Sequence, residues 1–489
     1  MIKYKPDILG NSIPSLCIIH GILILCLIGL SSFMASLQWM VIIGLLFSPL
    51  LFVFFFNCIN NPRFCLATYA TYSFFFSYVM RYLRKDGLSI GLDILVLTLF
   101  LACLLSLRKK NIDINLKNGL TIYLLTHLVW VGFVLIEFLN FGTTSEGMSR
   151  SLRSLCFTTT LLLILVSACL NTTKSIKTGL KLIGVFIIIA FCKLLYQKYI
   201  GFDDGELFWL YGLDGARTHI IYSGIRYFSL FSDAGNFGPY MAIITTVYGI
   251  IALKAPKKTW RLFCGVISLM GLIGMFMSGT RSAMIIPLSG LLLYCVLCKN
   301  IKMTILTAAV GICIYVFFSF TNIGEGNEYI RRMRTSFHPS EDASMNVRVE
   351  NRKEIATYIK AHPFGAGIGG SIPKLWLVGD RYIEGTLPPD SYYVSVWIQT
   401  GTYGLILKIA LICIVLLRCC WIIFFNIKNK ALRNVLAAFA CGLLGTYLNG
   451  YAGEAIGMPP TDFLITAMTC AILNGKNLDK QLQPQEAFI

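Results

Sequence analysis

The sequence predicts an all-α, polytopic integral membrane protein, and three observations support this fold class. Hydrophobic residues make up 56% of the 489 residues and charged residues only 13%, too few for a water-exposed surface. The mean hydropathy of +0.70 agrees with that composition. Apolar runs of about 20 residues, enough for a helix to cross roughly 30 Å of hydrocarbon, recur from end to end. A soluble fold is therefore excluded.

The apolar runs define the expected membrane spans, about 12 to 14 in all. They lie at 12–32, 38–56, 64–81, 89–107, 119–139, 154–170, 181–198, 233–253, 261–278, 283–298, 303–320, 391–417, 433–450 and 458–474. The first run lacks a small-residue cleavage site, so we expect a retained span and not a signal peptide. No internal repeat interrupts the pattern, and we expect one polytopic domain over 1–489.

Positive charge predicts how the spans are oriented. The net charge is +18, and much of it lies in short basic clusters between spans. These clusters are Arg108–Lys110, Lys174–Lys181, Lys254–Lys258, Lys299–Lys302 and Lys428–Arg433. The positive-inside rule places them, and both termini, in the cytoplasm, although Arg81–Lys85 would then fall outside. Membrane orientation accounts for much of this charge but not for all of it, and no nucleic-acid partner is expected.

Two long hydrophilic segments fall on the outer side in this topology. The first is 199–232, and the second, 321–390, contains a helical pattern over Val347–Ala361. Loops of this length in a compact membrane protein are usually functional. We therefore expect the chemistry in a large outer loop with short helices.

Arginine is frequent in these outer segments, where the positive-inside rule predicts it to be rare. The outer arginines are Arg217, Arg226, Arg281, Arg331, Arg332, Arg334, Arg348, Arg352 and Arg381. Guanidinium is always charged and its planar fork suits bidentate phosphate binding. The alternative for the loop arginines is ion pairing with the carboxylates of 325–384. Arg281 has no acidic neighbour between its apolar spans, and its alternative is snorkelling to the interface.

Metal and disulfide chemistry has weaker support. The 17 cysteines are scattered, many of them inside apolar runs and without flanking histidines, so we expect neither disulfides nor a metal cluster. The acidic stretch Asp203–Glu206 suits a metal ion, but we favour a solvated acidic turn.

Four segments resemble, in order and spacing across 217–410, the bacterial O-antigen polymerase and ligase superfamily. The first reads Arg226-Tyr-Phe-Ser-Leu-Phe-Ser-Asp233-Ala-Gly-Asn236, and the second Ser278-Gly-Thr-Arg281-Ser. The third joins Arg348 to Ala361-His362-Pro363-Phe-Gly365-Ala-Gly367-Ile-Gly369. The fourth reads Pro389-Asp390-Ser-Tyr392-Tyr393, followed by Gln399-Thr-Gly401-Thr-Tyr-Gly404.

This resemblance implies a membrane glycosyltransferase similar to the GT-C fold, acting on a glycan held on undecaprenyl diphosphate in the lipid bilayer. An acceptor hydroxyl would attack the anomeric carbon while the diphosphate leaves. Arg226 and Arg281 would stabilise the charge of the leaving group, so no metal or other cofactor is expected. A chain-length regulator protein is a further expected partner.

Asp390 stands where many members of this superfamily carry histidine. A carboxylate at the mouth of a span suits the orientation or deprotonation of an acceptor hydroxyl. The alternative is a helix N-cap, because Asp390 follows Pro388 and Pro389 and precedes an apolar helix. The departure from histidine favours a polymerase over a ligase.

The remaining candidates are substrate-binding residues on the same outer face. They are Arg217, Arg348, Arg352, Asn236, Tyr392, Tyr393, His219 and His338. The tyrosines suit stacking on sugar rings, although membrane-interface belts use the same residues. The glycines of 365–370 are expected to form tight turns, with diphosphate contact as the alternative.

The preferred function is an inner-membrane polymerase that joins lipid-linked oligosaccharide repeats on the periplasmic side, for O-antigen, capsule or exopolysaccharide. The first alternative is the ligase that transfers glycan to lipid A-core. The second is a flippase for lipid-linked glycans, which predicts internal repeats and charged residues at mid-membrane. We find neither feature in the sequence.

Overall fold

The computed structural model describes residues 52–83, 87–108, 114, 116–221, 224–298, 301–337, 343–378 and 381–482. The predicted spans 12–32 and 38–56 lie outside these residues, except for 52–56. Every later predicted span corresponds to a helix. The long helices are α3 (Pro62–Leu83), α4 (Ile90–Arg108), α5 (Ile122–Glu137), α7 (Thr160–Cys169), α8 (Thr173–Tyr199), α11 (Ala234–Lys254), α12 (Lys258–Met277), α13 (Ile285–Leu297), α14 (Ile301–Phe320), α17 (Tyr392–Trp421), α18 (Lys430–Asn449) and α19 (Thr461–Leu473).

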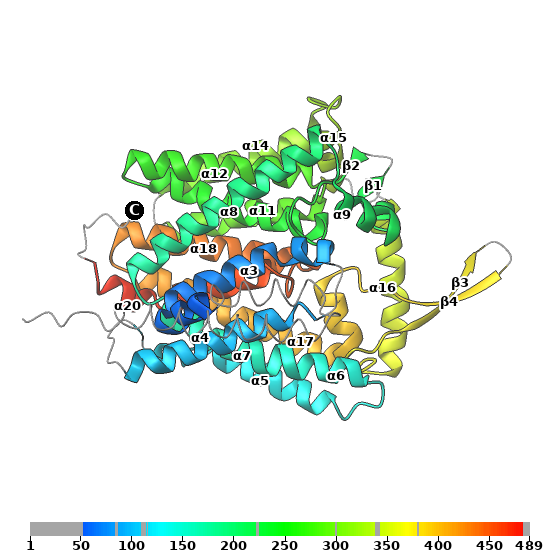
Figure 1. Ribbon diagram of the computed structural model, residues 1–489. Helices are drawn as coiled ribbons and strands as arrows, with labels where there is room; N and C mark the ends of the chain where they lie inside the picture. The colour runs from blue at the N-terminus through cyan, green and yellow to red at the C-terminus, as the bar shows by residue number, and fades with distance from the viewer. Residues whose placement is uncertain are drawn as a thin grey trace, which may run out of the picture.

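The all-α membrane fold is confirmed. Seven helices of the described chain are long and apolar enough to cross a membrane, and four shorter apolar helices accompany them. One span begins earlier than predicted, because α6 (Ser145–Ser151) and a π-helical stretch η2 (Leu152–Thr159) continue into α7. The long helices run side by side as one bundle (Figure 1).

The two most enclosed helices are α11 and α18. In their apolar windows 78% and 72% of residues are buried, against 22% for the window that begins with α17. Small residues allow this close packing: a Cβ on Gly445 would lie 2.6 Å from the Cα of Ile286 on α13. The bundle is therefore built around α11 and α18, and the other helices present apolar side chains outward.

One end of the bundle carries the non-spanning elements. These are α9 (Asp204–Leu207), α10 (Ala216–His219), α15 (Glu328–Arg334) and α16 (Ala343–Ala361), which runs across the helix ends (Figure 1). The helix predicted over Val347–Ala361 is part of α16. Two antiparallel hairpins were not predicted: β1 (Ile220–Ile221) with β2 (Gly224–Ile225), and β3 (Pro373–Val378) with β4 (Arg381–Thr386). The β3–β4 hairpin projects away from the bundle (Figure 1).

Arg81, the predicted exception to the charge rule, lies at this same end. Its guanidinium donates to the backbone carbonyls of Phe231 and Ser232 in the segment before α11, and only 7% of the residue is exposed. Arg81 is therefore an internal structural group, and the charge rule for loops in water does not apply to it.

The glycine run of 365–370 packs against the backbone of neighbouring segments. Gly365, Gly367 and Gly369 all have φ between 75° and 81°. Ala366 donates its N–H to the Ile398 carbonyl at 2.7 Å, and a Cβ on Gly401 would lie 1.9 Å from the Pro363 oxygen. Only glycine permits this approach. The predicted tight turns are present, and they fix the break in α17 at Gly401, where φ is 64°.

Candidate active site

A cavity of about 690 Å³ opens at the end of the bundle that carries α16. Its walls come from the 218–236 segment, the 279–282 break, α15, α16, residues 388–390 and the 452–458 loop. Arg226, Arg281, Arg348 and Asp390, which are up to 164 residues apart (390 − 226), all line it. The segments that resemble the O-antigen superfamily therefore supply one cavity.

Arg226 is held by neutral acceptors only. Its Nη1 donates to the Thr218 carbonyl at 3.0 Å, its Nη2 to Thr280 Oγ1 at 3.2 Å, and its Nε to the Ser278 carbonyl at 3.4 Å. No carboxylate of the described residues forms an ion pair with it. Burial lowers the pKa of Arg226 to about 10; Asp233 opposes this shift, and Arg281 and Arg348 add to it. The group remains charged at neutral pH.

The break after α12 orients this part of the wall. Thr280 accepts from Arg226 and donates to the Ala234 carbonyl at the start of α11, at 2.6 Å. The Thr280 N–H donates to Ser278 Oγ at 3.1 Å, and Gly279 has φ of 60°. The Ser-Gly-Thr sequence therefore turns the chain sharply, and Arg281 at the start of η4 (Arg281–Met284) faces the cavity.

Three other arginines of the cavity also donate to neutral oxygens. Arg281 Nη1 donates to Thr335 Oγ1 at 2.9 Å, and Arg332 Nε donates to the Gly279 carbonyl at 2.7 Å. Arg348 Nη1 donates to the Ala452 carbonyl at 2.9 Å. These bonds tie α15, α16 and the 452–458 loop to the cavity and hold positive charge around it.

Asp390 does not cap a helix. The cap of α17 is Ser391, whose Oγ accepts from the Val394 N–H at 3.4 Å. Asp390 has φ of 51°, in the left-handed region, and its Oδ2 accepts from Asn351 Nδ2 at 3.2 Å. Backbone strain of this kind costs of order 1–3 kcal/mol and tends to cluster at functional sites. The geometry favours the carboxylate facing the cavity over the capping alternative.

Asp233 and Glu454 add two further carboxylates. Asp233 caps α11 by accepting from the Asn236 N–H at 3.0 Å, which leaves its side chain at the cavity wall. Burial raises the pKa of Glu454, Asp233 and Asp390 raise it further, and Arg348 opposes the shift. Glu454 thus keeps its proton more readily than a solvated glutamate does.

His219 and Asn236 reach the cavity wall, but their polar atoms are used internally. Nδ1 of His219 lies 3.1 Å from the Gly215 carbonyl, and Nε2 accepts from the Ala234 N–H at 2.9 Å. Burial lowers the pKa of His219 to about 4, so the ring is neutral. The Asn236 amide bonds Pro459 and Thr461. Both residues support the wall.

Other predicted residues do not line this cavity. Arg217 is exposed, and Arg352 lies against Tyr451, donating to its carbonyl at 2.8 Å. Tyr393 Oη donates to the Tyr447 carbonyl, and Tyr392 lines a different cavity. His338 lies outside the described residues.

The sequence did not predict that Arg332, and not its neighbour Arg331, lines the cavity. Arg331 and Arg332 are adjacent on α15, yet only Arg332 lines the cavity, and Arg331 is exposed. A helical wheel alone does not predict which side of a seven-residue helix faces the bundle.

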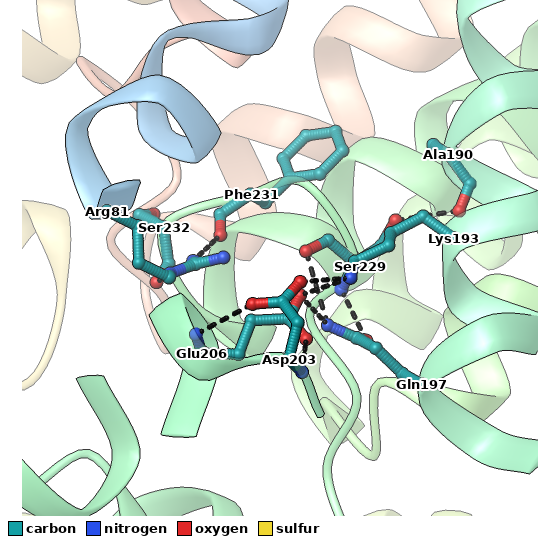
Figure 2. Close-up of polar contacts among 9 residues, drawn as sticks. All are labelled: Arg81, Ala190, Lys193, Gln197, Asp203, Glu206, Ser229, Phe231 and Ser232. Carbon is teal, nitrogen blue, oxygen red and sulfur yellow. Dashed lines mark hydrogen bonds and ion pairs between the residues drawn. The ribbon is translucent and has the colours of Figure 1, made fainter. Parts of the chain in front are cut away.

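A buried polar network next to the cavity overturns the prediction of a solvated acidic turn at Asp203–Glu206. Glu206 is fully buried, and it and Asp203 form a capping box. Lys193 pairs with Asp203 at 2.5 Å and with Glu206 at 3.1 Å. Figure 2 shows Lys193 and Gln197, from α8, beside these two carboxylates.

The same network fixes the segment that carries Arg226. Gln197 accepts from the Ser229 N–H at 2.9 Å, and Ser229 Oγ donates to the Ala190 carbonyl at 2.7 Å (Figure 2). Arg81 donates to the carbonyls of Phe231 and Ser232 from the opposite side (Figure 2). Residues 229–232 are therefore held between α3 and α8, which fixes the segment between Arg226 and Asp233.

The expectation of no charged residues at mid-membrane is wrong for Lys408. Lys408 lies in the middle of α17, and Asp462 is near the start of α19; both line a second cavity. Both were visible in the sequence within predicted spans 391–417 and 458–474. No group of three or more His, Cys, Asp or Glu side chains placed to hold a metal ion occurs in the part of the chain that is described.

The fold and the site together define a polytopic membrane protein with a guanidinium-rich cavity at one end of its bundle. Residues 266–409 match the family model of O-antigen ligase. This match confirms the resemblance predicted from the motifs over a range that contains Arg281, Arg348 and Asp390. No curated protein matches the chain.

Proposed function

We propose that this protein is an inner-membrane glycosyltransferase that joins undecaprenyl-diphosphate-linked oligosaccharide repeats into a polysaccharide on the periplasmic side. The observation that carries the proposal is the single cavity shared by Arg226, Arg281, Arg332 and Arg348, with Asp390 on its wall. The N–H groups of Arg226 donate to neutral oxygens, so no carboxylate cancels its positive charge, which can attract an anion.

The proposed step is one displacement at the anomeric carbon. The acceptor hydroxyl oxygen forms the new bond to that carbon, while the bond from the carbon to the diphosphate oxygen breaks. The hydroxyl proton passes to the Asp390 carboxylate, and the electron pair of the broken bond leaves with the diphosphate. Negative charge on the leaving group grows during the step, so fixed guanidinium groups stabilise the transition state more than the ground state.

Arginine takes the place that a divalent cation holds in many diphosphate-releasing enzymes. We propose that no metal is required, and activity should therefore survive chelation by EDTA. Strict dependence on added Mg²⁺ or Mn²⁺ would contradict this part of the proposal.

The periplasmic assignment rests on charge. Lys174, Lys254 and Lys428 lie at helix ends away from the arginine cavity. The backbone N–H groups of Lys428 and Asn429 donate to Asp479 of α20 (Gly475–Asp479) at that end. The positive-inside rule places that lysine-rich end in the cytoplasm. The arginine cavity then faces the periplasm, where lipid-linked repeats are assembled into polymer.

The ligase is the second candidate, because the matching family model is described as O-antigen ligase. Both reactions use the same donor chemistry and differ in the acceptor. Asp390 in place of the superfamily's histidine favours the polymerase. Deleting the gene separates the two: surface glycan of a single repeat indicates a polymerase, whereas full-length polymer stranded on its lipid carrier indicates a ligase.

The direct test is Arg281→Ala in purified protein supplied with lipid-linked repeats. We expect glycan extension to fall by about 10²–10³ or more, the effect of removing one transition-state charge donor. The matched control is Arg331→Ala, an exposed arginine at the same end of the bundle, which should extend glycan normally. Normal extension by a folded, inserted Arg281→Ala protein would refute the proposed mechanism.

A further inference from the structure

A second cavity, of about 900 Å³, lies beside the arginine cavity and is the larger of the two. Its lining runs from Glu146 and Arg153, near the end that carries α16, to Tyr123 and Val415 deeper in the bundle. Helices α3, α4, α5, α17, α18 and α19 all contribute. The proposed function makes no use of this space.

Lys408 and Asp462 face this cavity from two different helices. Both side chains are half-buried, and neither forms an ion pair or a side-chain hydrogen bond with another described residue. The Lys408 ammonium lies 4.5 Å from the ring centroid of Trp130. Ionisable groups among spanning helices that lack an ion pair or a hydrogen bond are costly and mark functional positions. A polar ligand that donates to Asp462 and accepts from Lys408 would satisfy both.

The remaining charges of the cavity compensate one another. Arg153 pairs with Asp93 at 2.5 Å, and Arg150 pairs with Glu146 one helical turn away. Together with Lys408 and Asp462 the cavity holds three cations and three carboxylates, counted over its lining. Such a balance disfavours an anionic ligand and suits a ligand rich in hydroxyl groups.

Aromatic rings and hydroxyl groups supply the rest of the lining. Trp130, Tyr123 and Tyr447 contribute rings, and Thr126, Thr158 and Ser395 contribute hydroxyls. Sugars are bound by this combination, because ring faces cover their C–H groups while charged and hydroxylic side chains bond their hydroxyls.

The two cavities share a wall. Residues 452–454 and 458 of the loop between α18 and α19 line the arginine cavity, and Ile456, Gly457 and Pro459 line the second. Asp390 faces the first cavity, and Tyr392, whose N–H donates to the Gly453 carbonyl at 3.0 Å, lines the second. A glycan in the second cavity would thus lie next to the carboxylate that activates the acceptor.

We propose that the second cavity is a saccharide-binding site, in which Lys408, Asp462 and Trp130 hold sugar residues of the acceptor glycan through their hydroxyl groups. That the bound glycan is the acceptor rests on the proposed function. Sugar binding itself can be measured without any transfer reaction. Lys408 and Asp462 are binding residues in this assignment and take no part in bond breaking.

The test uses the full-length protein in lipid nanodiscs and, as probe, the repeat-unit oligosaccharide released by mild acid from the host's own lipid carrier. Saturation-transfer NMR and equilibrium dialysis measure its binding. We expect Asp462→Asn, which keeps the side-chain shape, and Lys408→Met to weaken binding at least tenfold while thermal unfolding stays as in the wild type. Lys353→Met, an exposed lysine on α16, is the matched control and should bind normally.

Arg281→Ala separates this inference from the proposed function, since it should bind the free oligosaccharide normally yet fail in glycan extension. If the wild-type protein binds no oligosaccharide, or if both cavity variants bind it as the wild type does, the saccharide site is refuted whatever the transfer assay shows. If the wild-type protein binds oligosaccharide at this site but transfers no glycan, the proposed function fails and the saccharide site stands.

Discussion

The two cavities differ in the groups to which arginines such as Arg226 and Arg153 donate. In the arginine cavity, Arg226 and Arg348 donate to carbonyl and hydroxyl oxygens, which orient a guanidinium without cancelling its charge. In the second cavity, Arg150 and Arg153 pair with carboxylates. Arginines at the same end of the bundle therefore serve two purposes: some provide uncompensated positive charge, and others form ion pairs.

This difference shows that the number of arginines in a loop is a poor guide to an anion site. The partner of each guanidinium decides its role, because a carboxylate within 4 Å removes most of the field that a distant anion would feel. The same comparison predicts that charge changes in the arginine cavity reduce the rate of chemistry. Charge changes in the second cavity should instead reduce the affinity for sugar.

The comparison is tested most severely at Asp390, where we expect the largest effect. Asp390→Asn keeps the side-chain shape and tolerates a φ of 51°, but it removes the carboxylate. Loss of a general base should reduce the turnover of glycan extension by about 10²–10⁴. Turnover with purified lipid-linked repeats is the measurement.

Asp214→Asn is the control for Asp390→Asn, because Asp214 also has a left-handed backbone, with φ of 59°, but lies exposed and away from both cavities. It should leave turnover unchanged. Turnover of Asp390→Asn within a few-fold of the wild type would mean that Asp390 is not the general base and only shapes the backbone before α17.

The fold could be predicted from the sequence to the level of its helices. The length and apolarity of the runs from 64 on were sufficient, since a chain in lipid must satisfy its backbone internally. The β3–β4 hairpin and the continuous Ser145–Cys169 helix were not predicted. The hairpin and the start of this helix lie at the end of the bundle where polar residues replace apolar ones, so hydropathy no longer marks the start of an element.

A sharper version of the comparison uses the neighbours Arg331 and Arg332. Arg332→Gln removes a charge from the arginine cavity and weakens the bond that Arg332 makes to the Gly279 carbonyl. We expect glycan extension to fall by about 10–10². Arg331→Gln makes the same change in net charge on the exposed side of α15 and should have little effect. Equal losses in the two variants would mean that net charge of the loop, and not position in the cavity, sets the rate.

The site was only partly predictable, for reasons that these residues make plain. Arg226, Arg281 and Asp390 could be found because each sits in a short pattern next to a span. Arg332 could not be distinguished from Arg331 without the packing of α15. Glu206 looked like a solvated residue, yet it is buried because Lys193 and Gln197, nine or more residues earlier, supply its partners. Contacts between distant segments decide such cases.

The smallest expected effect concerns His219, which supports the wall beneath Arg226. Its pKa in the folded protein is about 4, mainly because of burial, whereas an unfolded chain titrates near 6.5. Between these values the unfolded state binds more protons, so the stabilisation is complete above about pH 6.5 and is lost as pH falls toward 4. The loss across this window amounts to about 3 kcal/mol.

Thermal unfolding of the wild type between pH 7.5 and 5 should therefore show a falling midpoint, and His219→Gln should show a flatter profile from a lower starting value. His362→Gln is the matched control, because His362 is exposed at the end of α16 and touches neither cavity. Both ring nitrogens of His219 bond the protein backbone, so His219 makes no hydrogen bond to a substrate. Its replacement should slow glycan extension only if it displaces Arg226. Parallel pH profiles for all three proteins would show that another group titrates in this range, and that the wall of the arginine cavity does not depend on a neutral imidazole.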